Sequence, residues 1–214
     1  MDRQVEEYIF EHLGLESSVL TELYRYTNLN VPYSGMISGH EQGRLLSMFS
    51  QMVNPDLILE IGAFTGYSTI CLAEGLKTGG CLHTIEKDDE RAEIASAFFG
   101  KAGIADRIVL HVGDALEIIP TLDMFFDLVF IDAAKKQYPE YYHAVFDRVK
   151  PGGYILVDNI LWYGKVANPQ IQDEATRQLR IFNDLVRDDT RIERAIVQNR
   201  DGLFLLRKRK MNIN

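Results

Sequence analysis

The segment from Leu57 to Ser68 constrains the fold of this chain more than any other. It reads L-I-L-E-I-G-A-F-T-G-Y-S, an apolar run that ends in an acid and opens through two glycines into a helix-like stretch. Such a run is typical of a strand buried in a parallel sheet, and doubly wound sheets bind nucleotide-like ligands at the turn that follows it. The segment therefore predicts a parallel α/β fold with a ligand at the carboxyl edge of the sheet.

The spacing of Gly62 and Gly66 narrows the class of ligand. Dinucleotide sites carry the pattern G-x-G-x-x-G, whereas three residues separate the two glycines here. Glu60 would repel a diphosphate and attract a cation. S-adenosylmethionine has a positive sulfonium, an ammonium group and no phosphate, so we expect Glu60 and the Gly62 turn to contact it. Glu86 ends the next apolar run and is placed to accept hydrogen bonds from both ribose hydroxyls.

Composition excludes several broad classes of protein. The chain has 214 residues and an apolar fraction of 46%, which suits one globular domain. No apolar run approaches the roughly 18 residues of a membrane span, and the first residues are too polar for a secretory signal. The net charge of −8 argues against broad electrostatic binding of nucleic acid. Cys71 and Cys81 lack a metal-ligand spacing and indicate buried thiols, so we expect a cytoplasmic protein.

Strand-like and helix-like segments alternate after Pro55. We expect a single domain over residues 1–214, in which a helical cap at 1–54 precedes an α/β core at 55–214. The alternation implies right-handed crossovers and a parallel sheet, and a polar turn at 199–201 indicates a closing hairpin. The prediction is a doubly wound, mostly parallel seven-stranded sheet whose last strand is antiparallel. Strands are expected at 57–61, 81–86, 108–112, 126–131, 154–157, 192–198 and 202–207, and helices between them at 68–77, 89–102, 115–122, 139–149 and 173–187.

Two further strand ends carry oxygen ligands. Asp132 ends the fourth predicted strand, and Asp158 and Asn159 end the fifth. All three should emerge at the same sheet edge as Glu60 and Glu86. Two carboxylates and an amide oxygen suit a hard cation such as Mg²⁺, and the lack of His or Cys disfavours zinc. A plain turn is the alternative interpretation of Asp158 and Asn159.

Lys135 is a candidate general base because it follows Asp132 by three residues. A divalent cation beside a lysine favours the neutral, basic amine. The alternative is a surface lysine next to Lys136.

Together these motifs resemble the metal-dependent class I O-methyltransferases, which include catechol and caffeoyl-coenzyme A O-methyltransferases and their bacterial relatives. The resemblance spans about residues 35–207. It implies a Rossmann-like methyltransferase fold with N-terminal helices and S-adenosylmethionine as methyl donor. The residues that carry it are E-I-G-A-F-T-G-Y-S at 60–68, I-E at 85–86, G-D-A at 113–115, I-D-A-A-K at 131–135, and K-P-G-G at 150–153 through D-N-I-L-W-Y-G at 158–164.

The resemblance also implies roles for individual residues. Lys135 is the expected base. The cation, Mg²⁺ or else Mn²⁺ or Ca²⁺, is expected at Asp132, Asp158 and Asn159. The residues expected to contact S-adenosylmethionine are Glu60 and Asp132, Gly62 and Ser68 at its methionine portion, Glu86 at the ribose, Asp114 and Ala115 beside the adenine, and Met36 and Ser38 from the N-terminal loop.

The expected acceptor is a small hydroxylated molecule of the catechol type. Ala134 and Lys136 stand where the plant branch of the family carries acids, so a coenzyme A ester is not expected here. Tyr33, Trp162 and Tyr163 would line the acceptor pocket by stacking or else belong to the core.

The remaining expectations concern the class of acceptor, the class of protein and the partners. The resemblance also covers bacterial relatives that methylate hydroxyuridine in tRNA, and Lys135, Lys136, Lys165 and the basic tail at 207–210 would then contact phosphates; a solvated terminus is the other interpretation of that tail. A non-enzymatic or nicotinamide-dependent protein is disfavoured by the missing G-x-G-x-x-G. The resemblance further implies a homodimer, with Tyr24, Tyr26 and Leu29 near its interface, and no membrane partner is expected.

Overall fold

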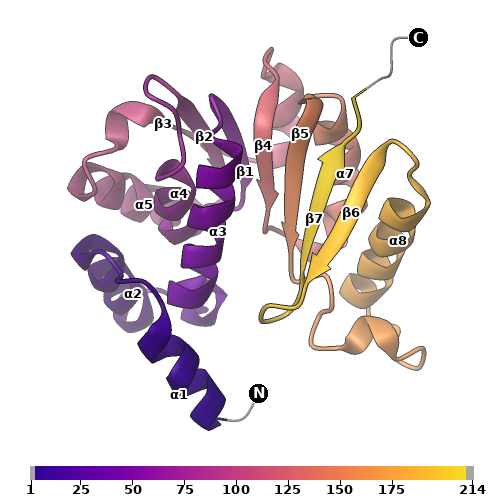
Figure 1. The fold of residues 1–214 in the computed structure, drawn as a ribbon, viewed down its shortest axis with the longest axis horizontal. Coiled ribbons are helices and arrows are strands. Elements are labelled where there is room, and N and C mark those ends of the chain that lie inside the picture. The colour runs from indigo at the N-terminus through magenta and orange to yellow at the C-terminus, as the bar shows by residue number, and fades with distance from the viewer. Residues whose placement is uncertain (1–2, 211–214) are drawn as a thin grey trace.

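Seven strands form one sheet in the computed structural model, which describes residues 3–210 (Figure 1). The strand order is β3-β2-β1-β4-β5-β7-β6. The first five strands pair in parallel, and β7 is antiparallel to both of its neighbours, β5 and β6. The predicted sheet and its antiparallel last strand are therefore confirmed. The strands are β1 Leu57–Ile61, β2 Cys81–Glu86, β3 Ile108–Val112, β4 Phe126–Ile131, β5 Val149–Asp158, β6 Ile192–Val197 and β7 Leu203–Lys208.

Each face of the sheet is covered by its own set of helices. Successive side chains of a strand point to opposite faces, so Leu59 and Ile61 join one apolar cluster while Ile58 joins the other. The first cluster packs against α6 Ala115–Ile118, α7 Tyr138–Phe146 and α8 Glu174–Asp188, and the second against α3 Gly39–Val53, α4 Tyr67–Ala73 and α5 Asp89–Lys101. The carboxyl ends of the parallel strands stay open between these two layers.

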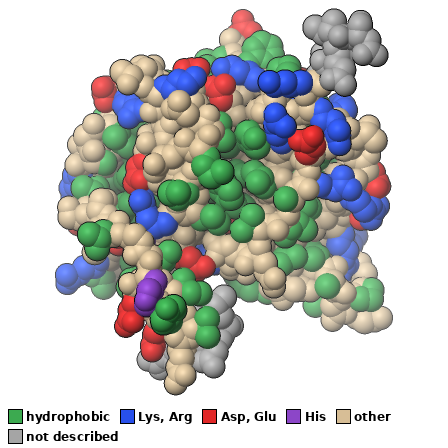
Figure 2. Space-filling view, viewed as in Figure 1, with side chains coloured by type: hydrophobic (Ala, Val, Ile, Leu, Met, Phe, Trp, Pro, Cys, Tyr) green, Lys and Arg blue, Asp and Glu red, His purple; other side chains and the backbone are tan. Residues whose placement is uncertain are grey.

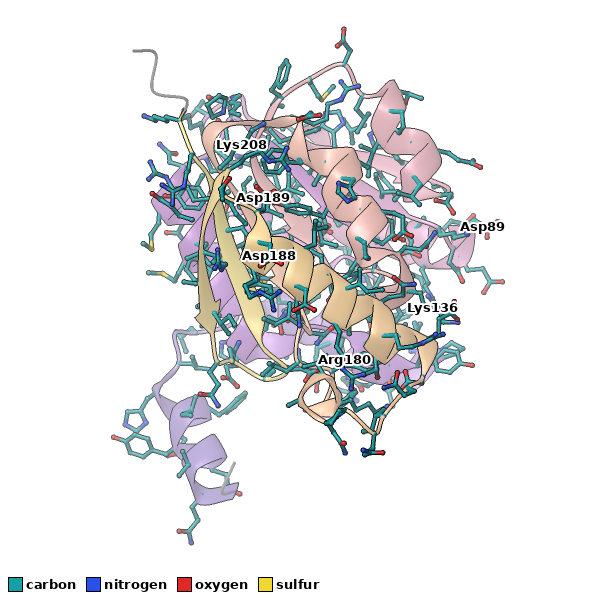
Figure 3. All side chains as sticks on the ribbon, turned by 90° about the vertical axis from the view of Figure 1, so that its right-hand side faces the viewer. Asp89, Lys136, Arg180, Asp188, Asp189 and Lys208 are labelled. Carbon is teal, nitrogen blue, oxygen red and sulfur yellow. The ribbon has the colours of Figure 1, made fainter. Side chains whose placement is uncertain are left out.

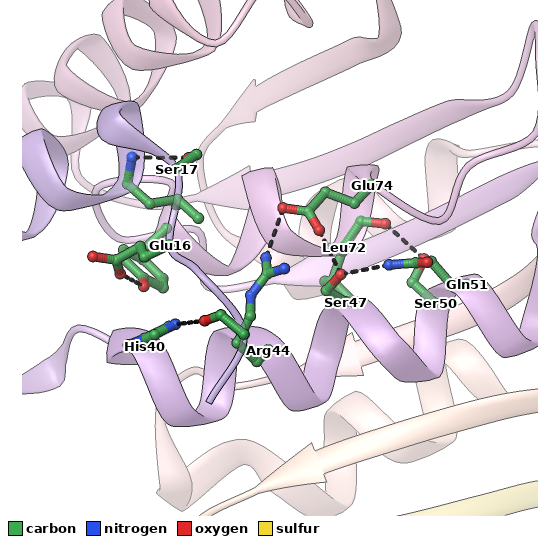
Figure 4. A network of polar contacts seen from close by, with 12 residues as sticks. Glu16, Ser17, His40, Arg44, Ser47, Ser50, Gln51, Leu72 and Glu74 are labelled. Atoms are coloured by element: carbon green, nitrogen blue, oxygen red, sulfur yellow. Dashed lines mark hydrogen bonds and ion pairs between the residues drawn. The ribbon is translucent and has the colours of Figure 1, made fainter. Parts of the chain in front are cut away.

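The N-terminal part is helical, as expected. It contains α1 Arg3–His12, α2 Ser18–Asn30 and α3, and α3 ends just ahead of β1, so the predicted boundary at 54/55 falls in their connection. The side chain of Ser17 caps α2 by accepting from the backbone N–H of Leu20 at 3.3 Å. Figure 4 shows the polar contacts that fix α3 against α4: Arg44 and Ser47 both reach the carboxylate of Glu74, at 2.7 and 2.5 Å.

Several elements differ from their predicted extents: α4 ends at Ala73 and not at 77, α7 ends at Phe146 and not at 149, and β5 and α6 differ more. β5 begins at Val149, five residues earlier than expected, and includes Pro151 and two glycines. The pairing of β5 with β4 shifts register between Phe126 and Leu128, so the proline lies at an irregularity of the ladder, where a missing N–H is tolerated. The predicted helix at 115–122 is α6 followed by the 3-10 turn Ile119–Thr121.

The start of the basic tail is part of the sheet and not a solvated terminus. Arg207 and Lys208 belong to β7. The ammonium group of Lys208, labelled in Figure 3, donates to the carbonyls of Phe146 and Val149 at 2.8 and 2.9 Å. Over residues 3–210, no helix is long and apolar enough to cross a membrane.

Hydrophobic side chains gather at the centre of the face seen in Figure 2, where α3 and the strands β5 and β7 lie. Met48 and Met52 of α3 are 56% and 75% exposed. Tyr154 and Leu205 are half-buried and pack against the same cluster as α3.

The two cysteines were expected to be buried thiols. Cys71 is buried, Cys81 is half-buried, and both thiols are free.

Candidate functional site

A cavity of about 760 Å³ opens at the carboxyl ends of the five parallel strands, β1 to β5. Its walls come from the turns after these strands, from the segment at 33–38 and from the turn between β6 and β7. The cavity brings together all but one of the residues predicted to bind a cofactor, hold a metal or act as base: Met36, Ser38, Gly62, Ser68, Glu86, Asp114, Ala115, Asp132, Lys135, Asp158 and Asn159.

Glu60 is the exception, because its side chain points away from the cavity. It is fully buried beneath α4. There it accepts hydrogen bonds from the hydroxyls of Ser68 and Thr84, at 2.6 Å each, and of Thr69. Burial raises the pKa of Glu60 to about 7. The alternation of β1 explains the placement: the odd-numbered Leu59 and Ile61 face α7, so Glu60 faces α4. The expectation that Glu60 contacts the cofactor directly was wrong.

The contact with Glu60 also changes what Ser68 offers to a ligand. A serine hydroxyl carries one proton, and Ser68 donates it inward to Glu60. Toward the cavity the hydroxyl oxygen therefore presents only lone pairs. The contact of Ser68 with the methionine portion of the cofactor stays a prediction.

Two glycines shape the turn after β1. Gly62 has a φ of 97°, and a Cβ atom there would lie 2.2 Å from the carbonyl oxygen of Asp132. Gly66 has a φ of 93°, and a Cβ atom would lie 2.6 Å from the ring of Phe99. Both positions need a residue without a side chain. The close approach of the turn to Asp132 keeps the ends of β1 and β4 together at the cavity.

Backbone groups orient the carboxylate of Glu86. One oxygen accepts from the N–H of Phe64 at 2.7 Å, and the other accepts from Lys87 and Asp88 at 3.0 Å each. The side chain is 7% exposed and lines the cavity. Three of its roughly four lone-pair sites are thus used, so this fixed carboxylate keeps one for a hydroxyl donor such as a ribose would present.

Asp114 caps the neighbouring helix α6. It accepts from the N–H of Leu116 at 2.9 Å and forms an ion pair with Lys87 at 2.8 Å. The hydrogen bond from Lys87 lowers the pKa of Asp114. Asp114 therefore stays ionised at the cavity wall, next to Ala115.

Lys135 belongs to the site and not to the open surface. Its side chain is 10% exposed, and its Nζ atom lies 2.6 Å from Oδ1 of Asp132 and 2.7 Å from the hydroxyl of Tyr138. Tyr138 in turn donates to the carbonyl of Asp158 at 2.9 Å. Lys136, by contrast, is a surface lysine: its side chain is 59% exposed and forms an ion pair with Glu174.

Asp132, Asp158 and Asn159 offer oxygen donors of the kind that hard cations prefer. Burial, followed by the charge of Asp132, raises the pKa of Asp158 to about 6, so the two acids lie close enough to repel each other. Within residues 3–210, no three His, Cys, Asp or Glu side chains are grouped to hold a metal ion. A cation would therefore use two carboxylates, the amide of Asn159, and water or substrate. This donor set fits Mg²⁺ and does not suit zinc.

Residues with strained backbone gather at the same cavity. A positive φ is uncommon for large side chains and costs about 1–3 kcal/mol for each residue. Outside the glycines of the described chain, Asn54 alone has a positive φ and does not line the cavity. The residues that do are Tyr33, Phe64, Asn159, Trp162, Tyr163 and Arg200, with φ between 46° and 60°. Such clustering is typical of functional sites.

Sequence reasoning left some of these residues undecided and missed others. The structure places Tyr33, Trp162 and Tyr163 at the cavity rather than in the core. It also brings in Arg200, which lies in a turn that the sequence marked only as a hairpin. Gln42 was missed as well: it is buried in α3 and bonds to Asp158. Neither residue stands in a local pattern that would single it out.

Comparisons with known proteins agree with this architecture. Residues 10–209 match the model of a family described as O-methyltransferase. The chain is 35% identical to a caffeoyl-CoA O-methyltransferase of Populus kitakamiensis, over 95% of this chain and 93% of that one. It is 32% identical to a catechol O-methyltransferase of Niastella koreensis, over 91% of this chain and 89% of that one.

Solved structures agree as well. The O-methyltransferase TomG from Streptomyces achromogenes, involved in tomaymycin synthesis and in complex with SAM, superposes with a TM-score of 0.90 at 31% identity, over 98% of this chain and 99% of that one. An O-methyltransferase from Bacillus cereus in complex with SAH superposes with a TM-score of 0.90 at 29% identity, over 96% of this chain and 97% of that one.

Proposed function

The chain belongs to the O-methyltransferase family, and we propose that it methylates one hydroxyl of a small catechol-like molecule with the help of a divalent cation. S-adenosylmethionine is the methyl donor, in keeping with SAM- and SAH-bound neighbours of the same fold. One observation carries the proposal: a single cavity is lined both by the oriented carboxylate of Glu86 and by the cluster of Asp132, Lys135 and Asp158.

The cofactor side of the cavity fits S-adenosylmethionine. When bound, this molecule supplies a methyl group on a positive sulfur; an acceptor oxygen forms the new C–O bond as the C–S bond breaks and S-adenosylhomocysteine leaves. Glu86 would hold the ribose hydroxyls, and the Gly62 turn would let the backbone approach the methionine portion. Met36 and Ser38 would cover the cofactor from the N-terminal segment. These contacts align the donor for an in-line displacement. Such alignment can supply much of the rate enhancement of a reaction between two bound molecules.

The acceptor side supports the cation and the base. Asp132, Asp158 and Asn159 would hold the cation, and when bound it supplies a Lewis acid that favours the ionised acceptor hydroxyl. Lys135 is the group in the cavity placed to take the hydroxyl proton, with its Nζ atom 2.6 Å from Asp132. Tyr138 accepts a hydrogen bond from the same nitrogen at 2.7 Å and holds it in place.

No contact on the described residues favours tRNA as the acceptor. Lys136 is paired with Glu174, and the ammonium of Lys165 lies 5.7 Å from the ring centre of Trp162. Arg180, labelled with Lys136 in Figure 3, donates to carbonyls of the loop before α8, including those of Val166 and Ile171. Lys136 and Lys165, two of the side chains expected to contact phosphates, thus have partners within the chain.

The test is methyl transfer from labelled S-adenosylmethionine to a panel of catechols and, in parallel, to bulk tRNA. We expect label in catechols, loss of transfer in chelator, and recovery with Mg²⁺ or Mn²⁺. Binding of S-adenosylhomocysteine in chelator is the control that the protein stays folded. Full transfer in chelator after exhaustive dialysis contradicts the metal dependence, and label in tRNA alone contradicts the small-molecule acceptor.

We also propose a homodimer, which the family resemblance implies. Tyr24, Tyr26 and Leu29 of α2 are 45%, 41% and 72% exposed. Exposed apolar side chains of this size are typical of surfaces that associate. Light scattering at micromolar concentration should give twice the 24.4 kDa of one chain, and a particle of 24.4 kDa contradicts the dimer.

A further inference from the structure

Two residues outside every sequence motif hold the side chain of Asp158. Nε2 of Gln42 donates to Oδ2 of Asp158 at 2.7 Å, and Nη1 of Arg200 donates to Oε1 of Gln42 at 3.1 Å. Gln42 and Asp158 are 2% and 3% exposed. Only one orientation of the Gln42 amide satisfies both neighbours, because a guanidinium has only donors and a carboxylate only acceptors. The amide therefore stands as a fixed donor against one oxygen of Asp158.

Arg200 anchors this contact to a second part of the cavity wall. The same Nη1 atom donates to the carbonyl of Ser38, in the segment that covers the cofactor side. Arg200 itself has a φ of 46° in the turn between β6 and β7. A residue in such a strained conformation is kept there by its contacts, so the contacts to Ser38 and Gln42 account for its position.

The two carboxylates of the site each have one oxygen engaged. Oδ2 of Asp158 accepts from Gln42, and Oδ1 of Asp132 accepts from Lys135. Each carboxylate then has one oxygen free of these contacts, and a cation that bound both oxygens would have to share the other with Gln42 or Lys135. Mg²⁺ takes six ligands in near-octahedral geometry, whereas Ca²⁺ takes six to eight and often binds both oxygens of a carboxylate. A carboxylate restricted to one oxygen suits the smaller ion.

We propose that Gln42, held by Arg200, is a positioning residue that makes Asp158 a one-oxygen ligand and thereby favours Mg²⁺ or Mn²⁺ over Ca²⁺ at this site. The inference rests on the proposed function, since that function supplies the cation at Asp132, Asp158 and Asn159.

Three variants separate the contacts of Gln42. Gln42→Met keeps the length and burial of the side chain and removes both polar contacts. Gln42→Glu keeps an acceptor for Arg200 and has no donor for Asp158. Gln51→Met is the matched control on the same helix, because the amide of Gln51 donates to Ser47 and not to the site.

The experiment follows Mn²⁺ binding by its electron paramagnetic resonance signal and then displaces Mn²⁺ with Mg²⁺ or with Ca²⁺. We expect Mg²⁺ to displace Mn²⁺ at lower concentration than Ca²⁺ does from the wild type and from Gln51→Met. In Gln42→Met, Mn²⁺ binding should weaken about 10- to 100-fold, the usual effect of losing a partner of a metal ligand. In both Gln42 variants the preference for Mg²⁺ over Ca²⁺ should fall by about tenfold, the lower end of the usual effect of losing a partner of a metal ligand.

The outcomes distinguish this inference from the proposed function. An unchanged ratio of Mg²⁺ to Ca²⁺ displacement in the Gln42 variants overturns the inference, even if both cations bind more weakly. Binding of S-adenosylhomocysteine should stay within about twofold in calorimetry, because Gln42 does not line the cavity; a parallel loss of that ligand makes Gln42 a structural residue and also overturns the inference. A wild type that binds no Mn²⁺ contradicts the metal dependence itself.

Discussion

The two sides of the cavity are built in different ways. The cofactor side consists of short turns directly after β1 and β2, and backbone groups set its geometry: three N–H groups orient Glu86, and Gly62 allows a close approach to Asp132. The acceptor side is assembled from segments far apart in the sequence, at 132–135, 158–163 and 200. Its contacts run between side chains, and several of its residues have positive φ.

This difference indicates which side of the cavity can change its side chains between members of the family. A site made by the backbone tolerates many side-chain changes around it, because the donors stay in place. A site made by side chains on loops changes with each substitution, and loops accept substitutions readily. We therefore expect the cofactor side to be robust and the acceptor side to determine the substrate. The following predictions test that contrast.

Lys135→Ala should produce the largest effect and should affect the acceptor side alone. Loss of a general base lowers kcat by roughly 10²–10⁴-fold. Affinity for S-adenosylhomocysteine, measured by calorimetry, should barely change because the side chain of Lys135 contacts Asp132 and Tyr138. Lys136→Ala is the matched control, since Lys136 is paired with Glu174. A kcat near that of the wild type across pH 6–9 would remove the base assignment.

Gly62→Ala should disrupt the cofactor side, because there the backbone itself is the site. The left-handed conformation costs about 1–2 kcal/mol for a residue with a Cβ atom, and overpacking about 1–3 kcal/mol, so the unfolding free energy should fall by about 2–5 kcal/mol. Gly164→Ala is the control: it has a φ of 75° with nothing within 4 Å of its Cβ position. Denaturant melts that show equal losses for the two variants would contradict the role of the close approach.

The sequence was sufficient for the parts of the site that depend on neighbours in the chain. The strand, turn and helix at 57–73 and the acid at Glu86 could be predicted because apolar runs and glycine spacing are local signals. Glu60 was misplaced because its partners Ser68, Thr69 and Thr84 come from two other elements. Arg200 and Gln42 are 158 residues apart. Only tertiary packing brings such a pair together, so no local pattern predicts it.

Glu86→Ala tests whether the oriented carboxylate acts on the cofactor. Removing a charged hydrogen-bond partner of the ribose should weaken S-adenosylhomocysteine binding by about 1.5–3 kcal/mol, or roughly 10- to 150-fold. The three N–H groups that Glu86 now satisfies would turn to water, so a thermal melt must accompany the calorimetry. Unchanged affinity in a folded variant would remove Glu86 from the ribose site.

Glu60→Gln should have the smallest effect on the site, because it should change stability alone. Burial raises the pKa of Glu60 from 4.5 to about 7, so between these pH values the folded state binds a proton that the unfolded state has released. The free energy of unfolding then falls as pH rises through this window, by up to about 1.4 kcal/mol per pH unit. Glutamine cannot ionise, so the variant should lose this part of the slope.

Urea melts of the wild type and of Glu60→Gln at pH 5, 6 and 7 measure that difference directly. The pKa of Asp158 is raised to about 6 as well. Asp158 is present in both proteins, so its contribution to the pH dependence of stability cancels in the comparison. We expect the stability of the wild type relative to the variant to decrease steadily from pH 5 to pH 7. Parallel curves would mean that Glu60 is ionised throughout, with its three hydroxyl donors outweighing burial. Binding of S-adenosylhomocysteine should be the same for both proteins, because the carboxylate of Glu60 supports α4 from beneath and never reaches the cavity.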